Sequence, residues 1–515
     1  MKKCRLVALF LALIMLASVT PLALADEVPT LTVMRVGVDR IWNPEAPNNQ
    51  KVMELLGVNL DVTTVDAETL TLNFASGDLA DIVTINNLDF AEFVSSGYLL
   101  PLDDLLAEYG QNILNVTTEF ALDCCKVDGK LYALPHENNN VKYFTSMRHD
   151  WLKTLGYDLS KYPQLPDSDI YEIPLADYEQ MLLDMTKKDP DGNGKDDTYG
   201  LSTYGLFSDA TAFMGIYGAF GGVRTQYYAK EDQLWAYETT EEYRNALVEL
   251  NKLWEMGVID PEMFILQKDQ AYAGLMNGKA GTFISWWSTA YELIRDGMFD
   301  LQPTTEWATA VIVGPEGHKG AKDNGRVTNT VCITTSCEDP ALAMKVLNAM
   351  HTDEIWWLVR YGIAGEHYNV DANGVYDGTR TEAGQKLFES MNMDCLYTLI
   401  NAIDLENFAN SLYPTDPIMQ IRWTMLVHQY VKDAPLYHDA VYGLAKPQES
   451  MDYGVDVDNC VKSYNMKFIT GELEIDDANW ADYLEAWKNA GGSDILAAYT
   501  EAYNDKNGTE LEPAM

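Results

Sequence analysis

Basic residues are scarce in this sequence, and their scarcity excludes classes of partner. There are 36 Lys and Arg residues against 78 Asp and Glu residues, which gives a formal net charge of −42 at pH 7. Such a surface repels nucleic acid and anionic lipid, so we expect no nucleic-acid partner. Neutral or cationic ligands are favoured, although a pocket lined by arginine side chains could still hold an anion.

Cysteines are also few. The chain has 7 cysteines in 515 residues, which is too few for a disulfide framework. No Cys-x-x-Cys motif occurs, so zinc binding and redox chemistry have little support. Adjacent Cys124 and Cys125 rarely pair with each other, whereas Cys332 and Cys337 flank a short turn, and pairing between these two stays open.

Catalytic motifs are missing as well. The sequence contains no Gly-x-Ser-x-Gly, no His-Glu-x-x-His and no phosphate-binding glycine loop. With 78 acidic residues, neighbouring carboxylates arise by chance, and none stands in a recognisable glycosidase context. We therefore expect no enzymatic activity, no catalytic residues and no organic cofactor.

Only one long hydrophobic run is present, and it lies at the N-terminus. Lys2, Lys3 and Arg5 precede the apolar run Leu6–Val19, and Ala23-Leu24-Ala25 follows it. This pattern predicts a signal peptide over residues 1–25 and export to the periplasm, the medium or the cell surface. An uncleaved anchor is the alternative, although the run is short for a membrane span. Cleavage would change the net charge to (36 − 3) − 78 = −45.

The stretch 189–200 has the oxygen spacing of a calcium-binding loop. Side-chain oxygens fall at alternate positions, and Gly194 at the sixth place permits a sharp bend. The twelfth place holds Gly200 instead of Glu, and Thr198–Ser202 has the pattern of extended chain. We therefore predict a single structural Ca²⁺ site and no EF-hand switch; an Asp/Gly turn without metal is the alternative. The predicted ligands are Asp189, Asp191, Asn193, the carbonyl of Lys195 and Asp197.

Strand and helix patterns alternate along the chain. Strands are predicted at Leu31–Val38, Leu60–Val65 and Asp81–Ile85, with helices at Asn48–Leu56 and Glu68–Ala75 between them. Such strand–helix–strand units form parallel sheets whose ligands bind beyond the carboxyl ends of the strands. The fold class is therefore α/β.

The pattern continues after a polar segment, 136–147, which we interpret as a crossing between domains. A turn at 362–368 is interpreted as a second crossing. The further predicted elements are helices Leu175–Lys188, Glu241–Met256, Asp269–Met276 and Pro340–His351, and strands Thr282–Trp286, Trp307–Val313 and Gly325–Thr334.

Several stretches, in this order, resemble the extracellular solute-binding proteins of ABC transporters, in the large-sugar group (family 1) that includes alginate-binding proteins. They are Ala75–Ile82, Gly97–Asp103, Asp128–Pro135, Arg148–Leu152, Asp189–Gly200, Gly257–Glu262, Asn277–Gly281, Gly362–Tyr368 and Phe468–Glu472. The resemblance implies a monomer with two lobes in a type II-like arrangement, each a mostly parallel sheet flanked by helices. It also implies hinge closure on an oligosaccharide or glycoside, which is then delivered to membrane permease subunits.

Two features depart from the family pattern. In alginate-binding members an acidic residue follows the last calcium-loop Asp, whereas Thr198 follows Asp197 here. Members from single-membrane bacteria carry a lipid-attached cysteine, but Cys4 precedes the apolar run and cannot serve as one. The division that we predict is residues 26–140 and 305–365 for the N-terminal lobe, and 141–304 and 366–515 for the C-terminal lobe.

Sugar sites combine aromatic faces, which stack on pyranose rings, with planar hydrogen-bonding groups. Core packing is the alternative for each aromatic residue, solvated surface for each charged one, and a satisfied turn for Asn138. A peptide- or chelate-binding protein on the same fold, or a secreted glycoside hydrolase or lyase, are the alternative functions. The candidate substrate-binding residues are Trp42, Tyr217, Trp286, Trp287, Trp423, Asp39, Arg40, Asn138 and Glu366.

Overall fold

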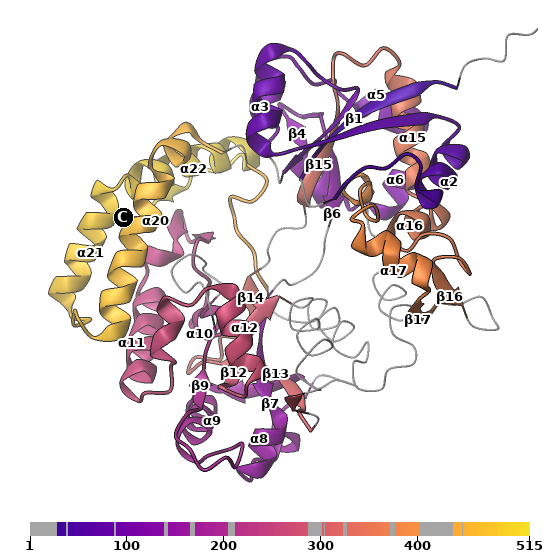
Figure 1. Cartoon of the computed structure of the whole chain (residues 1–515). Coiled ribbons are helices and arrows are strands. Elements are labelled where there is room, and N and C mark those ends of the chain that lie inside the picture. Colours follow the sequence, from indigo (N-terminus) through magenta and orange to yellow (C-terminus); the bar gives the residue numbers. More distant parts are fainter. Residues whose placement is uncertain are drawn as a thin grey trace, which may run out of the picture.

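The computed structural model places helices and sheets in two lobes (Figure 1). Each lobe has its own five-stranded sheet and its own hydrophobic core. Within the described residues, no helix is both long and apolar enough to cross a membrane. The structure describes residues 28–37, 40–86, 89–137, 143–164, 170–203, 212–286, 301–302, 304–322, 327–370, 376–400, 436–444 and 446–514.

The first sheet has the strand order β2-β1-β3-β15-β6. β1 pairs in parallel with β2 and β3, whereas β15 is antiparallel to both β3 and β6. Four strands therefore run in one direction and only β15 opposes them. The bounds are β1 Thr30–Val36, β2 Asn59–Val65, β3 Ile82–Asn86, β6 Leu134–Glu137 and β15 Val327–Ile333.

Short helices surround this sheet, and their ends follow local chemistry. α3 begins at Asp66, whose carboxylate accepts a hydrogen bond from Thr69 N–H, and it ends at Gly77 in the left-handed region. The helices of this lobe are α2 Pro47–Leu56, α3 Ala67–Ser76, α4 Ala91–Ser95, α5 Asp103–Tyr109, α6 Gln111–Val116, α7 Glu119–Cys124, α15 Pro340–Met350, α16 Asp353–Arg360 and α17 Glu382–Glu389. Two hairpins accompany them, β4 Lys126–Val127 with β5 Lys130–Leu131, and β16 Tyr368–Val370 with β17 Tyr376–Arg380.

The second sheet has the order β8-β13-β7-β12-β9. Here β7 is the opposing strand, antiparallel to β12 and β13. Both sheets are thus mostly parallel in strand direction, as the resemblance implied. The bounds are β7 Tyr143–Arg148, β8 Ile170–Pro174, β9 Tyr199–Leu201, β12 Ala280–Trp286 and β13 Trp307–Val313.

The remaining elements complete the second lobe. α9 is amphipathic and buries one apolar face, including Tyr178, Met181 and Met185. The other helices are α8 His149–Thr154, α9 Leu175–Lys187, α10 Met214–Ala219, α11 Glu241–Glu255 and α12 Lys268–Met276. The small sheets are β10 Tyr227–Lys230, β11 Gln233–Ala236 and β19 Glu512–Pro513, and β14 Ala321–Lys322 with β18 Leu436–Tyr437.

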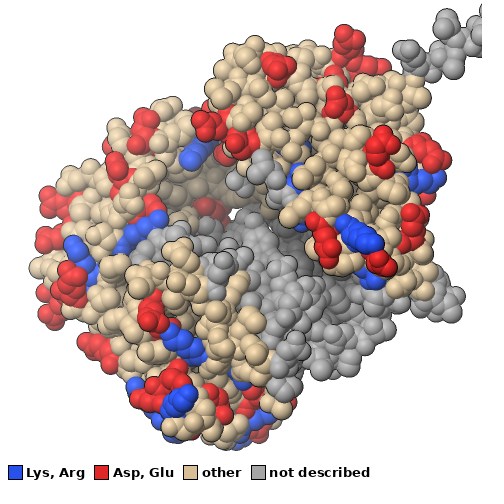
Figure 2. All heavy atoms as spheres, viewed as in Figure 1, with Lys and Arg blue, Asp and Glu red and all other residues tan. Residues whose placement is uncertain are grey.

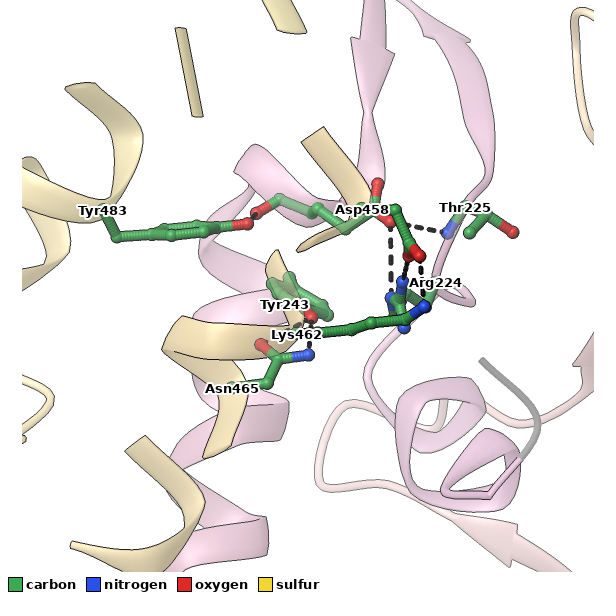
Figure 3. Close-up of polar contacts among 8 residues, drawn as sticks. Arg224, Thr225, Tyr243, Asp458, Lys462, Asn465 and Tyr483 are labelled. Atoms are coloured by element: carbon green, nitrogen blue, oxygen red, sulfur yellow. Dashed lines mark hydrogen bonds and ion pairs between the residues drawn. The ribbon is translucent and has the colours of Figure 1, made fainter. Parts of the chain in front are cut away.

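Three C-terminal helices, α20 (Gln448–Thr470), α21 (Asp477–Asn489) and α22 (Gly492–Asn507), lie side by side next to α11 (Figure 1). A buried arginine ties α20 to the rest of the lobe (Figure 3). The Arg224 side chain is 4% exposed and forms ion pairs with Asp458 of α20 and with Glu238. Pairing offsets the desolvation of this charge and fixes the position of α20.

The structure differs from the predicted organisation in three places. β13 lies in the second sheet, although residues 305–365 were assigned to the first lobe, because β7 and β8 are its hydrogen-bonding partners. Tyr368 and Ile400 pack in the first core, although the sequence after residue 365 was assigned to the second lobe. The turn 362–368 is not a crossing, since both of its ends contact the first core.

Most predicted elements agree with the structure within one or two residues. The polar segment 136–147 does connect the lobes, because β6 ends at Glu137 in the first sheet and β7 begins at Tyr143 in the second. Cys332 and Cys337 are both free thiols, so the possible disulfide between them is absent.

Candidate functional site

The carboxyl end of β1 carries two of the predicted site residues. Arg40 and Trp42 follow this strand, and the Ile41 amide donates to the Met391 carbonyl at 2.9 Å. The Arg40 guanidinium lies 3.6 Å from the Met391 sulfur. Trp42 is half-buried against the first core. Arg40 and Trp42 are therefore neighbours at one edge of the first sheet, beside Met391, a residue that sequence reasoning missed.

At the carboxyl ends of β12 and β13 the second sheet has a small recess. Its wall includes Thr145 and Thr309, which lie on neighbouring strands. Because Thr145 pairs with Ala310 and Thr309 with Ser146, the two threonine side chains point to opposite faces of the sheet, and that of Thr145 faces α10. Helix α10 closes one side, where Gly218 approaches the Gly320 carbonyl so closely that a Cβ would lie 2.1 Å from its oxygen. The lining residues are Thr145, Met214, Gly215, Ile284, Thr309, Ala310, Val311, Ile312, Gly320 and Ala321.

None of the recess residues was predicted from the sequence. The only signal is weak: Thr309 is the single polar residue of the apolar, buried strand β13. Thr145 has no such signal, because β7 also contains Ser146 and Arg148. The recess lies near the connection between the lobes. Thr145 stands two positions after Tyr143, the residue at which the chain enters the second sheet. Figure 2 shows a hollow between the lobes on the face that it displays.

Tyr217 lies in the second core. It is 3% exposed, and its ring stacks on that of Tyr243 with the centroids 5.5 Å apart. Burial raises the pKa of Tyr217 to about 12. Tyr217 is therefore a core residue, and its prediction as a ligand residue is wrong. The Gly-rich sequence around it reflects close helix packing.

Glu366 lies in an exposed turn of the first lobe, and its side chain is 52% exposed. Its carboxylate is 3.8 Å from the ring of His367, a buried histidine whose Nδ1 accepts from the Ile363 amide. Burial lowers the pKa of His367, against the opposing effect of Glu366. The described contacts of Glu366 include neither Arg40 nor Trp42.

Five predicted site residues remain. Trp286 is the last residue of β12, and its main chain is paired with Tyr143. Asp39, Asn138, Trp287 and Trp423 lie outside the described residues.

The predicted calcium loop is closed by its own side chains. Asp189 accepts hydrogen bonds from the amides of Asn193 and Gly194 at 3.1 and 3.0 Å. The Asn193 side-chain amide donates to Asp191 at 2.7 Å and to Asp197 at 3.1 Å. The Asn193 side chain therefore bridges two of the three loop carboxylates, and the third accepts hydrogen bonds from the main chain of the same loop.

Electrostatics in the loop agree with this arrangement. Partial burial raises the pKa of Asp191, opposed by the Asn193 amide and supported by the nearby charges of Asp189 and Asp197. Over the described part of the chain, however, no group of three or more His, Cys, Asp or Glu residues has the arrangement of a metal site.

Comparison with known proteins decides the family. The model described as "Bacterial extracellular solute-binding protein" matches residues 57–355, more than half of the chain. The chain belongs to this family. Its members are binding proteins, and the resemblance noted in the sequence is confirmed.

Curated relatives cover nearly all of this family member. It is 24% identical to "Lipoprotein LipO" of Bacillus subtilis, with 90% of this chain and 91% of LipO aligned. It is 25% identical to the "Polygalacturonan/rhamnogalacturonan-binding protein YtcQ" of the same organism, over 90% of each chain.

Solved structures share the fold. The Streptococcus pneumoniae substrate-binding protein FusA, in complex with kestose, has a TM-score of 0.66 at 19% identity, covering 93% of this chain and 99% of FusA. The alginate-binding protein AlgQ2, solved without calcium ion, has a TM-score of 0.64 at 17% identity, covering 93% of this chain and 98% of AlgQ2. The two-lobed α/β fold predicted from the sequence is confirmed.

Proposed function

We propose that this solute-binding protein captures an oligosaccharide or glycoside between its lobes and presents it to an ABC permease, without bond chemistry. The observation that carries this proposal is that polar and aromatic groups follow a strand of one lobe while a recess with a threonine in its wall lies in the other. Arg40 and Trp42 follow β1 in the first lobe, and Thr145 and Thr309 line the recess in the second. Hydroxyl and guanidinium groups beside an aromatic face suit a sugar ring.

The capture step is a shift of population between open and closed lobes. A ligand that contacts Arg40 on one lobe and Thr145 on the other stabilises only the closed state, in which both residues reach it. In this proposal β13 moves with the second lobe, and Trp286, Trp287, Asp39, Asn138, Trp423 and Glu366 remain candidate ligand residues. Relatives named for polygalacturonan and kestose binding support the choice of a carbohydrate.

Two further parts of the proposal concern location and metal. The N-terminal segment directs export, and the acidic surface of the exported protein suits a neutral ligand (Figure 2). The loop 189–197 holds Ca²⁺, with carboxylate oxygens of Asp189, Asp191 and Asp197, the Asn193 side-chain oxygen and the Lys195 carbonyl as ligands. Bound Ca²⁺ would offset two of the three negative charges of carboxylates that otherwise repel one another.

The test is isothermal titration of the chain from Asp26 onward against kestose, oligogalacturonate, a rhamnogalacturonan fragment and a short-peptide mixture. Saturable binding of one glycan class, with that glycan recovered unchanged by chromatography, is the expected result. Binding of peptides only, or turnover of a glycan, would overturn the proposal. Arg40→Ala and Thr145→Val should each weaken the binding without lowering the melting temperature by more than a few degrees.

A further inference from the structure

One residue of the second lobe is bound to the first lobe at the place where the chain passes between them. The Tyr442 hydroxyl accepts a hydrogen bond from the Val327 amide at 2.8 Å and donates one to the Val327 carbonyl at 3.1 Å. Its ring stacks on Phe120 of α7, with the ring centroids 6.1 Å apart. Val327 is the first residue of β15 in the first sheet. Tyr442 thus satisfies both main-chain groups of that residue.

Tyr442 itself belongs to the second lobe. Val441 beside it is buried in the second core. The Ala440 amide donates to the Tyr227 carbonyl at 2.8 Å, and the Tyr227 amide donates to the Asp439 carboxylate at 3.1 Å. Movement of the second lobe must therefore carry Tyr442 with it.

The contact is wider than one side chain. Gly443 has φ +79°, and a Cβ at this position would lie 2.7 Å from the Cys124 sulfur of α7. Lys506 of α22 lies 3.4 Å from the Asp123 carboxylate of the same helix. Helix α7 of the first lobe is therefore packed directly against the segment that carries Tyr442.

In the described part of the chain, the first-lobe residues nearest the passages to the second lobe lie close together. Val327 pairs with Glu137 in the sheet, and Glu137 is the last residue of β6 before the connection 138–142. The next strand residue, His136, donates a ring N–H to the carbonyl of Ile400, the last described residue before the third connection. The Glu137 carboxylate in turn accepts hydrogen bonds from the amide and the hydroxyl of Thr118, the residue that caps the N-terminus of α7.

Chain length restricts how the lobes can turn. Glu137 and Tyr143 are separated by residues 138–142, and Lys322 and Val327 by residues 323–326. Connections of this length span at most roughly 20 Å. Rotation of one lobe on the other must therefore occur close to Glu137 and Val327, and points near a rotation axis move least.

We infer that Tyr442 is a positioning residue for ligand capture: its bond to Val327 is a fixed pivot, kept in the open and the closed protein, that sets the axis of lobe closure. This inference rests on the proposed function for the role of closure, while the contact itself can be tested without ligand. A pivot reduces the freedom that the lobes lose on closing, and so favours binding.

Hydrogen exchange at the Val327 amide tests the contact in the glycan-free protein. Tyr442→Phe removes both hydrogen bonds and keeps the ring, and we expect the Val327 amide to exchange about tenfold faster. Tyr437→Phe is the matched control for this exchange measurement only, because its hydroxyl donates at 2.9 Å to the carbonyl of Gly218, which lies within the second lobe. Small-angle scattering should show a wider spread of radius of gyration for Tyr442→Phe only. Equal exchange in wild type and Tyr442→Phe would overturn the contact.

Addition of the glycan that binds the wild type then tests the pivot. With kestose or oligogalacturonate bound, the Val327 exchange rate should stay within about twofold of its glycan-free value, and Tyr442→Phe should weaken binding about fivefold. A Val327 exchange rate that rises or falls clearly on binding would show that the Tyr442 contact differs between the open and the closed protein, and would overturn the pivot. If no glycan binds the wild type, the proposed function fails, whereas the exchange and scattering results still decide the contact.

Discussion

Glu249 of α11 and Glu179 of α9 share a single ammonium group. Lys252 Nζ lies 2.6 Å from the Glu179 carboxylate and 3.4 Å from that of Glu249. Burial, followed by the hydrogen bond and charge of Glu179, raises the pKa of Glu249 from 4.5 to about 7, against the effect of Lys252. One lysine cannot neutralise two carboxylates, which favours the protonated form of the more buried Glu249.

The pH dependence of stability follows from this shift. Between pH 4.5 and about 7 the folded protein still binds a proton at Glu249, whereas the unfolded chain has released it. The stabilisation from this group is therefore fully present below pH 4.5 and is lost as the pH rises to about 7. Glu249→Gln should flatten the melting temperature between pH 4.5 and 7. Glu255→Gln, at an exposed position of the same helix, is the control. Parallel profiles for wild type and Glu249→Gln would contradict the prediction.

The Arg224 pair should matter more than a second arginine–aspartate pair in the same lobe. Asp458→Asn leaves the buried guanidinium with Glu238 alone, and we expect a loss of about 1–2 kcal/mol in the free energy of unfolding. Arg244 and Asp477 lie 2.7 Å apart, but the Asp477 side chain is 97% exposed. Asp477→Asn should therefore cost less than about 0.5 kcal/mol. Chemical denaturation measures both, and equal losses would show that burial of Arg224 is unimportant.

Trp42 and Tyr217 should respond differently to truncation. Tyr217→Ala opens a cavity in the second core and should cost roughly 3 kcal/mol of stability, with the glycan affinity of the folded fraction unchanged. Trp42→Ala should weaken glycan binding at least tenfold, for a smaller loss of stability, since Trp42 is only half-buried. Calorimetric titration beside thermal unfolding separates the two effects. A weakened affinity in Tyr217→Ala alone would return that residue to the binding site.

Calcium should stabilise the protein through the loop 189–197. EDTA treatment followed by Ca²⁺ should raise the melting temperature, and Asp191→Asn should reduce that rise, because one of the three loop carboxylates loses its charge. Asp196→Asn is the control, since the neighbouring Asp196 is not among the predicted ligands. A rise that is equal in both variants would place the calcium elsewhere.

Local order was readable from the sequence because short-range chemistry decides it. The strand of alternating residues at Leu31–Val38, the helix after Asp66 and the turn at Gly194 each depend on neighbours within a few positions. The ordered set of family stretches also lies in the sequence itself. Fold class and family could therefore be predicted.

Tertiary structure decided everything that depends on partners far along the chain. β13 is apolar enough to pair in either sheet, and only its bonds to β7 and β8 place it in the second. Tyr217 has the composition of a ligand residue, yet it stacks on Tyr243 in the core. Tyr442 carried no signal at all, because its two hydrogen bonds join residues 115 positions apart. Residue type and spacing determine local conformation, whereas burial and long-range pairing follow from the packing of the whole chain.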